Sequence, residues 1–519
     1  MQVLHRDDGS SKNITLIDKK NIHNNRLQVI NQYEVKQADG ARHDNRYDVT
    51  ILVNGFPLVH VELKRRGVAI REAFNQINRY QRDSFWAGCG LYEYVQIFVI
   101  SNGTNTKYYS NSTRYNAIKD AKHGKTKKEK TSNSFEFTSY WADANNRVLT
   151  DLIDFTRTFF AKHTILSVLT RYCIFTSEKM LMVMRPYQIT ATERILNRIE
   201  IANNYKKYGS IEGGGYIWHT TGSGKTMTSF KSAQLIASSK DADKVIFLMD
   251  RIELGTQSLK EYRNFAEENE EVQATENTDV LVDKLKSTSP SDTLIVTSIQ
   301  KMSNIKDDAQ NKLNPNDIAL INAKRLVFIV DECHRSTFGD MMQTIKHTFP
   351  KALFFGFTGT PIQGENQKKM STTATVFGNE LHRYSIADGI RDHNVLGFDP
   401  YKVLTFKDSD LRKAVALEKA KAYSVDEALA DPQKSKVFYK YLNLPMTGGK
   451  DALGEEIKGI EDYIPNTQYE GEEHQKAVVE DICENWQTQS RNSKFHAIFA
   501  TSSICLLYTS PSPRDKRQS

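Results

Sequence analysis

Three side chains near the N-terminus could together bind a metal ion and hydrolyse a phosphate ester: Asp48, Glu62 and Lys64. Two neighbouring carboxylates form an oxygen site suited to Mg²⁺. A bound Mg²⁺ polarises a phosphate group and lowers the pKa of a bound water. The lysine ammonium can orient the nucleophile or stabilise the negative charge that develops. These residue types therefore predict metal-dependent phosphodiester hydrolysis, provided that the fold brings them together.

An antiparallel hairpin would bring them together. Residues 46–53 and 58–64 have the composition of strands, and an Asn-Gly-Phe-Pro sequence with turn chemistry lies between them. A hairpin that turns about Gly55 sets Asp48 opposite Glu62. Side chains alternate along a strand, so the lysine two residues after Glu62 shares its face. We therefore expect all three groups on one side of the sheet.

The Glu-x-Lys spelling alone is a weak signal, because Glu and Lys alternate on many exposed strands. The next predicted helix, 69–85, adds a QxxxY spelling, and together these residues resemble the PD-(D/E)xK nucleases. Tyr stands where that family often has Pro before the aspartate, a substitution that the family tolerates. The resemblance implies catalytic and metal-binding roles for Asp48 and Glu62, a catalytic role for Lys64, and supporting roles for Gln76 and Tyr80.

A second set of residues, IWHTTGSGKTMTSF at 217–230, has the composition of a phosphate-binding loop. It follows a short predicted strand and opens a predicted helix, as such a loop requires. The glycines let successive backbone N–H groups point at phosphate oxygens. The strict pattern GxxxxGK[ST] has glycine at its first position, where this chain has His219, but the shorter TGSGKT form is common in helicase-like motors. The expected nucleotide-binding residues are Thr221, Gly222, Ser223, Gly224, Lys225 and Thr226.

The sequence RLVFIVDECHRS (325–336) supplies carboxylates at the end of an apolar strand. Open parallel sheets bind ligands at this carboxyl edge. Asp331 is expected to hold Mg²⁺ together with the Thr226 hydroxyl, and Glu332 to orient or deprotonate the attacking water. Taken alone, the acidic pair could be an ordinary strand end.

Two further segments agree with a nucleotide-driven motor. FFGFTGTP (354–361) resembles the helicase motif that links the ATP state to domain movement, which implies coupling roles for Thr358, Gly359 and Thr360. In RPYQITA (185–191), the amide of Gln188 could pair with adenine N6 and N7. The alternative for Gln188 is an exposed residue on a helix.

Short apolar strands between helices predict an α/β fold with a parallel sheet covered on both faces. The expected motor strands are 216–218, 244–250, 293–299, 325–332 and 352–359, with a further strand at 496–500. In the first part, another strand is expected at 94–101 and a helix at 141–161. The Lys-rich segment 119–134 reads as solvated surface, with DNA-backbone contact as the alternative.

The chain has 519 residues, a formal net charge of +7 and five cysteines without a CxxC pair. This mild positive charge permits nucleic-acid binding without requiring it. Neither a disulfide framework nor a zinc site is expected. No apolar run approaches the roughly 18–20 residues of a membrane span. The composition fits a reducing cytoplasm and no membrane partner.

The spellings NRYDVTILVNGFPLVHVELKRRG, HTTGSGKT, DECHRS and GFTGTP resemble the restriction (R) subunit of type I restriction-modification enzymes. The resemblance implies a nuclease domain at 1–165, a first RecA-like superfamily 2 motor domain at 166–375, and a linker with the start of a second RecA-like domain at 376–505. It implies ATP and Mg²⁺ as cofactors and double-stranded DNA as substrate, in a bacterial or archaeal cytoplasm. Methyltransferase (M) subunits, which bind S-adenosylmethionine, and a specificity (S) subunit would be partners.

Two other functions stay open at this point: a stand-alone helicase-nuclease of DNA repair or defence, and an inactive DNA-binding fragment. The segment 506–519 is expected to be a tail foreign to the fold, because it turns Ser-, Pro- and Arg-rich with no helix to follow the last strand. The later motor motifs, with their arginine finger, are missing after the last expected strand. The chain is therefore expected to bind ATP weakly, if at all, and to be unable to translocate.

Overall fold

The computed structural model describes 2–14, 16–36, 44–85, 91–113, 133–249, 273–274, 278–305, 315–331, 333, 338–362, 372–398, 408–446, 448–450, 456–464 and 472–497. Two compact units make up the chain, Met1–Gly397 and Phe398–Ser519. The expected strand 496–500 and the expected tail 506–519 lie wholly or largely outside the described residues. Unit 1 holds all the candidate site residues.

The first part of unit 1 contains a seven-stranded sheet of order β3-β4-β5-β6-β7-β8-β9, in which the β5–β6 pair is parallel and the other pairs are antiparallel. Helix α1 packs on β5 and β6. An N-terminal hairpin, β1–β2, and a small hairpin, β10–β11, form separate two-stranded sheets. The strands are β1 (Gln2–His5), β2 (Ser11–Ile14), β3 (Leu27–Val35), β4 (Asn45–Val53), β5 (Phe56–Leu63), β6 (Ile97–Ser101), β7 (Thr106–Ser110), β8 (Ser139–Ala142), β9 (Val148–Leu149), β10 (Cys173–Phe175) and β11 (Leu181–Val183), and the helices are α1 (Ile70–Asp83), α3 (Leu152–Phe159) and α4 (Lys162–Thr170).

Because side chains point alternately to the two faces along each strand, a buried core forms on each face of this sheet. On β6, Ile97 and Val99 join the core with α3 and α4, whereas Phe98 and Ile100 join the aromatic core under α1. A strand with both neighbours paired and both faces covered shows this pattern, because its side chains point alternately to opposite faces. Glu62 therefore lies among buried aromatic residues.

One expected helix and one strand boundary were wrong. The segment expected as a helix at 141–161 forms the end of β8, a turn, β9 and only then α3, which begins at Leu152. Its first half is held by pairing with β7, a tertiary contact that outweighs local helix propensity. The strand expected at 94–101 begins at Ile97, because residues 91–94 form a 3₁₀ turn.

The second part of unit 1 is built on a seven-stranded sheet of order β14-β15-β13-β16-β17-β12-β18, whose pairings are all parallel. The five expected strands are confirmed within two residues at each end. The strands are β12 (Gly215–His219), β13 (Lys244–Met249), β14 (Gln273–Ala274), β15 (Leu294–Ser298), β16 (Leu326–Val330), β17 (Leu353–Thr358) and β18 (Glu380–Tyr384), and the helices are α5 (Pro186–Asn204), α6 (Lys225–Ser239), α8 (Thr278–Lys286), α9 (Ile299–Ser303), α10 (Pro315–Asn322), α11 (Phe338–Thr348), α12 (Thr373–Phe377) and α13 (Ile386–Arg391).

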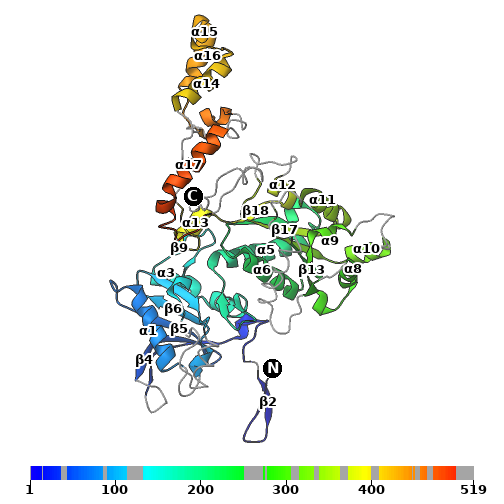
Figure 1. Ribbon diagram of the computed structural model, residues 1–519. Helices are drawn as coiled ribbons and strands as arrows, with labels where there is room; N and C mark the ends of the chain where they lie inside the picture. The colour runs from blue at the N-terminus through cyan, green and yellow to red at the C-terminus, as the bar shows by residue number, and fades with distance from the viewer. Residues whose placement is uncertain are drawn as a thin grey trace, which may run out of the picture. The chain divides into compact units, whose positions relative to one another are not determined.

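Helices cover both faces of this sheet, as expected for parallel strands. On β13, Val245 and Phe247 pack in the core with α5 and α6, whereas Ile246 and Leu248 pack in the core with α8, α9 and α11. Figure 1 shows α5 and α6 together against the sheet. The carboxyl ends of the strands thus form one edge at which loops carry the phosphate-binding motif.

Unit 2 is mainly helical in its described part, with one short strand pair, β19–β20. Helices α14 and α16 pack against each other, and α15 joins them, around a small core with Ala416, Ala428 and Phe438. Its elements are α14 (Asp408–Ala420), α15 (Val425–Ala430), α16 (Pro432–Leu442), β19 (Gly449–Lys450), β20 (Glu456–Ile457) and α17 (Glu472–Gln489).

Candidate functional site

The β4–β5 hairpin forms as the Asn-Gly sequence predicts. Asn54 and Gly55 both have positive φ, 51° and 90°, which is the combination of a two-residue type I′ turn. The register shifts by one residue at a β-bulge between Ile51 and Leu52, and beyond the bulge Val49 lies opposite Val61. Asp48 thus lies beside the end of β5, where its Oδ2 accepts a 2.8 Å hydrogen bond from the backbone N–H of Leu63.

The predicted nuclease residues form one hydrogen-bonded chain. The Lys64 ammonium donates to Glu62 Oε1 at 2.7 Å and to Gln76 Oε1 at 2.8 Å. The Gln76 amide then donates to the Tyr80 hydroxyl at 2.5 Å, and that hydroxyl donates to the Arg46 carbonyl oxygen at 2.9 Å. Gln76 and Tyr80 lie four residues apart on α1, so they share one helix face. The helix thereby holds the lysine against the carboxylate.

The carboxylates suit a divalent cation. Glu62 is 1% exposed, and its Oε2 has no hydrogen-bond partner among the described residues. Burial, assisted by the neighbouring Glu62 charge, raises the pKa of Asp48, while the Leu63 N–H and Lys64 oppose this. A bound cation would favour the ionised form of Asp48. Two carboxylates fit Mg²⁺, which keeps several waters beside one or two carboxylates.

The phosphate-binding loop lies between β12 and α6. Gly222 and Gly224 adopt positive φ, 82° and 78°, a conformation that glycine takes at no steric cost. The Tyr187 hydroxyl donates to the Ser223 carbonyl oxygen at 2.7 Å, and the Ser223 hydroxyl donates to the Thr220 carbonyl oxygen at 2.6 Å. These hydrogen bonds fix two carbonyl groups of this segment, so contacts within the protein define the conformation of the loop.

The unexpected His219 has a structural explanation. It is fully buried, and its Nε2 lies 3.0 Å from Nδ1 of His382 on the neighbouring strand β18. Burial lowers the pKa of both imidazoles, that of His382 to about 4. Two neutral rings can share one hydrogen bond, whereas two charged rings would repel each other. A side chain at this position therefore joins β12 to β18 behind the loop.

A cavity of about 620 Å³ opens beside this loop. Gly222, Gly224 and Thr226 line it, together with Gln188 from α5 and Tyr108 from the first part of the unit. Its volume is within the range of small-molecule sites, about 300–1,000 Å³. The location suits the base and ribose of a nucleotide whose phosphates lie on the loop.

Gln188 was expected either to contact adenine or to be an exposed residue on a helix, and the second of these is wrong. It is 2% exposed, and its amide nitrogen donates to the Ser223 carbonyl oxygen at 3.1 Å. Its carbonyl oxygen accepts from the backbone N–H of Arg185 at 2.9 Å. Gln188 thus buttresses the loop, and its contact with adenine stays a prediction.

The remaining motor residues lie at the same edge of the sheet. Asp331 directly follows β16, which pairs with β17, and β17 pairs with the loop-bearing strand β12. Glu332 lies outside the described residues. Gly359 follows β17, where the Trp218 indole donates to its carbonyl oxygen at 3.1 Å.

Gly359 also approaches the phosphate-binding loop closely. A Cβ placed on it would lie 3.1 Å from Thr221 Oγ1 and 3.3 Å from the Lys225 ammonium. Thr358 is fully buried, and its hydroxyl accepts from the backbone N–H of Thr360 at 3.1 Å. The segment expected to couple ATP state to movement therefore contacts the residues expected to bind phosphate.

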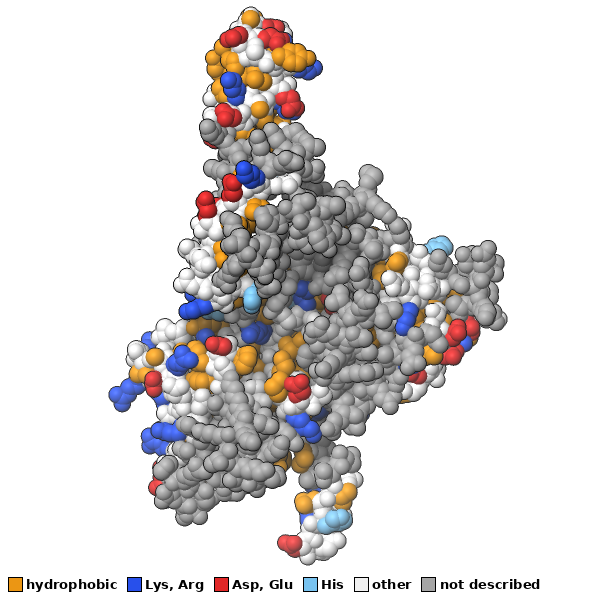
Figure 2. All heavy atoms as spheres, in the orientation of Figure 1, with side chains coloured by type: hydrophobic (Ala, Val, Ile, Leu, Met, Phe, Trp, Pro, Cys, Tyr) orange, Lys and Arg blue, Asp and Glu red, His pale blue; other side chains and the backbone are white. Residues whose placement is uncertain are grey.

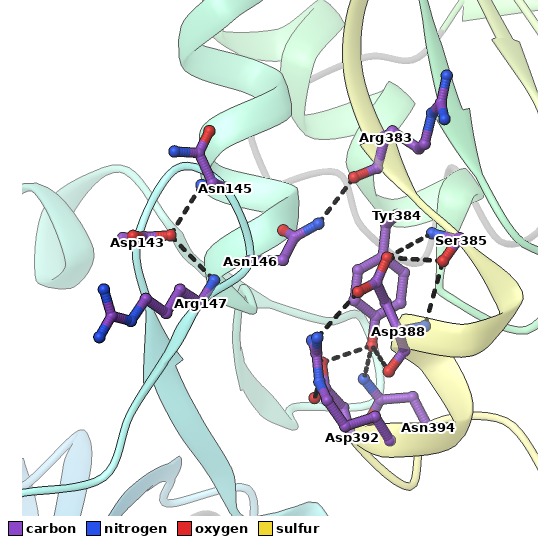
Figure 3. A network of polar contacts seen from close by, with 11 residues as sticks. Asp143, Asn145, Asn146, Arg147, Arg383, Tyr384, Ser385, Asp388, Asp392 and Asn394 are labelled. Atoms are coloured by element: carbon purple, nitrogen blue, oxygen red, sulfur yellow. Dashed lines mark hydrogen bonds and ion pairs between the residues drawn. The ribbon is translucent and has the colours of Figure 1, made fainter. Parts of the chain in front are cut away.

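The two parts of unit 1 are joined by polar contacts at the β8–β9 turn (Figure 3). The Asn146 amide donates to the Arg383 carbonyl oxygen at 2.8 Å, at the end of β18. Arg194 of α5 donates both to the Leu381 carbonyl oxygen and to the Ala144 carbonyl oxygen in the turn, at 2.5 and 3.0 Å. The two parts also share a hydrophobic core, because Met227 of α6 belongs to the same buried cluster as residues of β5 and β6.

Sequence reasoning missed several residues of these sites. His60, Tyr187, His382 and Tyr384 are buried around the carboxylates or the loop. Only His60 had a usable signal, because a residue two positions before Glu62 must share its face. The rings of Tyr187 and Tyr384 stack with their centroids 3.7 Å apart. The two residues are almost two hundred positions apart in the sequence, so no local sequence pattern predicts this contact.

Comparisons with known proteins agree with both parts. Residues 1–117 match the family model "Type I restriction enzyme R protein N terminus", and residues 187–435 match "SWI2/SNF2 ATPase". The chain is 41% identical over 412 residues to the SauMSSORF170P type I restriction endonuclease subunit of Staphylococcus aureus, covering 79% of this chain and 40% of that protein. It is 55% identical over 194 residues to the EcoprrI endonuclease subunit of Escherichia coli, 37% of this chain and 56% of that protein.

A third relative is a putative type I restriction enzyme MpnIIP endonuclease subunit, C-terminal part, of Mycoplasma pneumoniae. It is 43% identical over 210 residues, which cover 40% of this chain and 99% of that protein. The chain spans about 40% of the length of the staphylococcal relatives that it matches. Among the helices that the structure describes, none is both long and apolar enough to cross a bilayer. The match to the R protein N-terminal family, the match to the SWI2/SNF2 ATPase family and these relatives place this chain in the family of type I restriction enzyme endonuclease (R) subunits.

Proposed function

We propose that the chain provides the nuclease and the ATP-driven motor of a type I restriction-modification enzyme. In this proposal it moves double-stranded DNA at the expense of ATP and cuts it, with Mg²⁺, away from the recognition site. The single observation that carries the nuclease assignment is the Lys64 ammonium held between Glu62 and Gln76, on the strand that Asp48 contacts.

At the nuclease site, Asp48 and Glu62 would hold one Mg²⁺. The ion, when bound, supplies polarisation of the scissile phosphate and a bound water of lowered pKa. The Lys64 ammonium, which donates to Glu62, would orient the nucleophile or stabilise the developing negative charge. Gln76 and Tyr80 fix the position of that ammonium from α1.

Arginines around this site would contact the DNA backbone. Arg65, Arg66, Arg71 and Arg79 are all exposed, just beyond β5 and along α1. On the face drawn in Figure 2, Lys and Arg side chains are spread over the first part of unit 1. Guanidinium groups bind phosphate oxygens in two-point geometry, and such contacts carry no sequence information. This agrees with a subunit that leaves sequence reading to its S partner.

At the motor site, the loop from Thr221 to Thr226 would bind the phosphates of ATP, with Mg²⁺ held by Thr226 and Asp331. Glu332 would activate the attacking water, and Gln188 would contact adenine. Thr358, Gly359 and Thr360 would pass the ATP state to the second motor domain. The M subunits, which bind S-adenosylmethionine, and the S subunit would hold this chain on DNA in the bacterial or archaeal cytoplasm.

Nicking of supercoiled plasmid with Mg²⁺ tests the nuclease directly. Asp48→Ala and Lys64→Ala should abolish nicking, and Asp154→Ala, which removes an exposed carboxylate on α3, should leave it unchanged. Undiminished nicking by the Lys64 variant would contradict the assignment. In the complex with M and S subunits, cleavage should additionally require ATP.

A further inference from the structure

A histidine lies behind the nuclease carboxylate on the same strand. His60 precedes Glu62 by two residues, so both point to the same face of β5. Both are buried, at 0% and 1% exposure, and His60 Nε2 lies 3.6 Å from Glu62 Oε2. Lys64 takes the other carboxylate oxygen, Oε1. Glu62 is therefore flanked by an imidazole on its buried side and an ammonium on its more exposed side.

The imidazole and the carboxylate oxygen lack other partners. Within the described residues, neither ring nitrogen of His60 has a hydrogen bond, and Glu62 Oε2 has none. A buried polar atom without a partner destabilises the folded state. An N–H···O hydrogen bond spans about 2.7–3.2 Å, so a shift of a few tenths of an ångström would pair the two groups.

Aromatic rings hold the imidazole in place. Tyr47 and Phe85 approach it edge-on with centroids at 5.5 and 5.4 Å, and Tyr80 and Phe98 follow at 6.1 and 6.5 Å. A phenylalanine could fill such a cage, so packing alone does not require a histidine. What the histidine adds is a ring nitrogen 3.6 Å from the carboxylate oxygen.

We propose that His60 is a positioning residue for the nuclease: its Nε2–H donates to Glu62 Oε2 and fixes the direction in which the carboxylate meets the metal ion. A carboxylate oxygen has lone pairs for both contacts. Partners of this kind, which orient a ligand without touching the metal, typically change metal affinity or activity by about 10–100-fold when removed. This inference rests on the proposed nuclease function.

Two amide substitutions separate positioning from packing. In His60→Gln the amide nitrogen can reach the place of Nε2, whereas in His60→Asn it lies near the place of Nδ1 and cannot reach Glu62. His60→Phe keeps the ring and removes the donor. Thr50→Val is the control, because Thr50 is buried opposite His60 in the register and bonds Tyr92 rather than a carboxylate.

The measurement is the dissociation constant for Mn²⁺, by electron paramagnetic resonance of the free ion, on the full chain, together with the melting temperature and plasmid nicking. We expect His60→Asn and His60→Phe to weaken Mn²⁺ binding about 10–100-fold, and His60→Gln to stay within about threefold of wild type. Thr50→Val should lower the melting temperature without changing Mn²⁺ binding.

Either of two results would contradict the role of His60 without affecting the nuclease proposal. One is unchanged Mn²⁺ affinity in the folded His60→Asn or His60→Phe variant, and the other is an equal loss of Mn²⁺ affinity in His60→Gln. A different result would remove the nuclease proposal itself. If the wild-type chain shows no Mn²⁺ binding that Asp48→Asn abolishes, the metal site is absent and His60 has nothing to position.

Discussion

The Asn146 side chain donates a 2.8 Å hydrogen bond to the Arg383 carbonyl oxygen, across 237 residues of sequence. This bond joins the β8–β9 turn of the nuclease part to the end of β18 in the motor part (Figure 3). The next residue of β18, Tyr384, accepts at its carbonyl from the backbone N–H of Thr220 and stacks on Tyr187. The β8–β9 turn is therefore linked to the phosphate-binding loop through strand β18.

Asn146→Gly should loosen this junction. Asn146 has φ 62°, so glycine keeps the backbone conformation while removing the amide. Loss of one half-buried hydrogen bond should lower the free energy of unfolding by about 1 kcal/mol. Hydrogen exchange at 143–147 and 380–384 should accelerate. Asn145→Gly is the matched control, because the Asn145 side chain makes no described contact with β18. Equal exchange in the two variants would show that the amide does not hold the turn.

Gln76→Ala should slow plasmid nicking about 10–100-fold without abolishing it. The substitution removes one of the two acceptors of the Lys64 ammonium and frees the Tyr80 hydroxyl, while the salt bridge with Glu62 remains. Gln81→Ala, on the same helix, removes a buried hydrogen bond to Asn111 instead. Gln81→Ala should lower the free energy of unfolding but change the nicking rate per folded molecule little. Comparable nicking rates for the two variants would therefore argue against a role for Gln76 at the site.

Much of this arrangement could be predicted from the sequence. The hairpin followed from Asn-Gly between two alternating runs, and the motor strands followed from apolar runs between helices. What escaped prediction depends on tertiary contacts. β18 reads ELHRY, and its His382 is a polar residue that is buried in the strand beside His219 of the neighbouring strand β12. The β8–β9 segment has helix-compatible apolar spacing, and its pairing with β7 decides otherwise.

Stability should fall in mild acid because of the His219–His382 pair. Burial lowers the folded-state pKa of His382 to about 4, below the ordinary value of 6.5. The unfolded chain therefore binds more protons between these values, so stability is full above about pH 6.5 and is lost as the pH falls towards 4. For this one group the loss between pH 7 and pH 5 is about 2 kcal/mol, from 1.36 kcal/mol per unit. Urea unfolding of wild type and His382→Asn at both pH values measures it, and the variant should show a smaller difference. Equal pH dependence would assign the acid sensitivity to other groups.

Gly359→Ala should impair nucleotide use while leaving the fold intact. The added methyl group would lie 3.1 Å from Thr221 Oγ1 and 3.3 Å from the Lys225 ammonium, closer than ordinary van der Waals contact. Because the φ of Gly359 is not positive, alanine adds no backbone strain, and the effect should fall on the position of the ammonium. We expect binding of a fluorescent ATP analogue to weaken several-fold, and DNA-stimulated ATP hydrolysis in the complex with M and S subunits to fall further.

Gly397→Ala is the matched control for this substitution, because its added methyl group would meet only Ile390 at 3.9 Å. It should bind the analogue as wild type does. If Gly359→Ala also binds and hydrolyses ATP normally, the segment after β17 does not sense the occupant of the loop. The close approach of Gly359 to Lys225 would then reflect packing at the sheet edge rather than coupling.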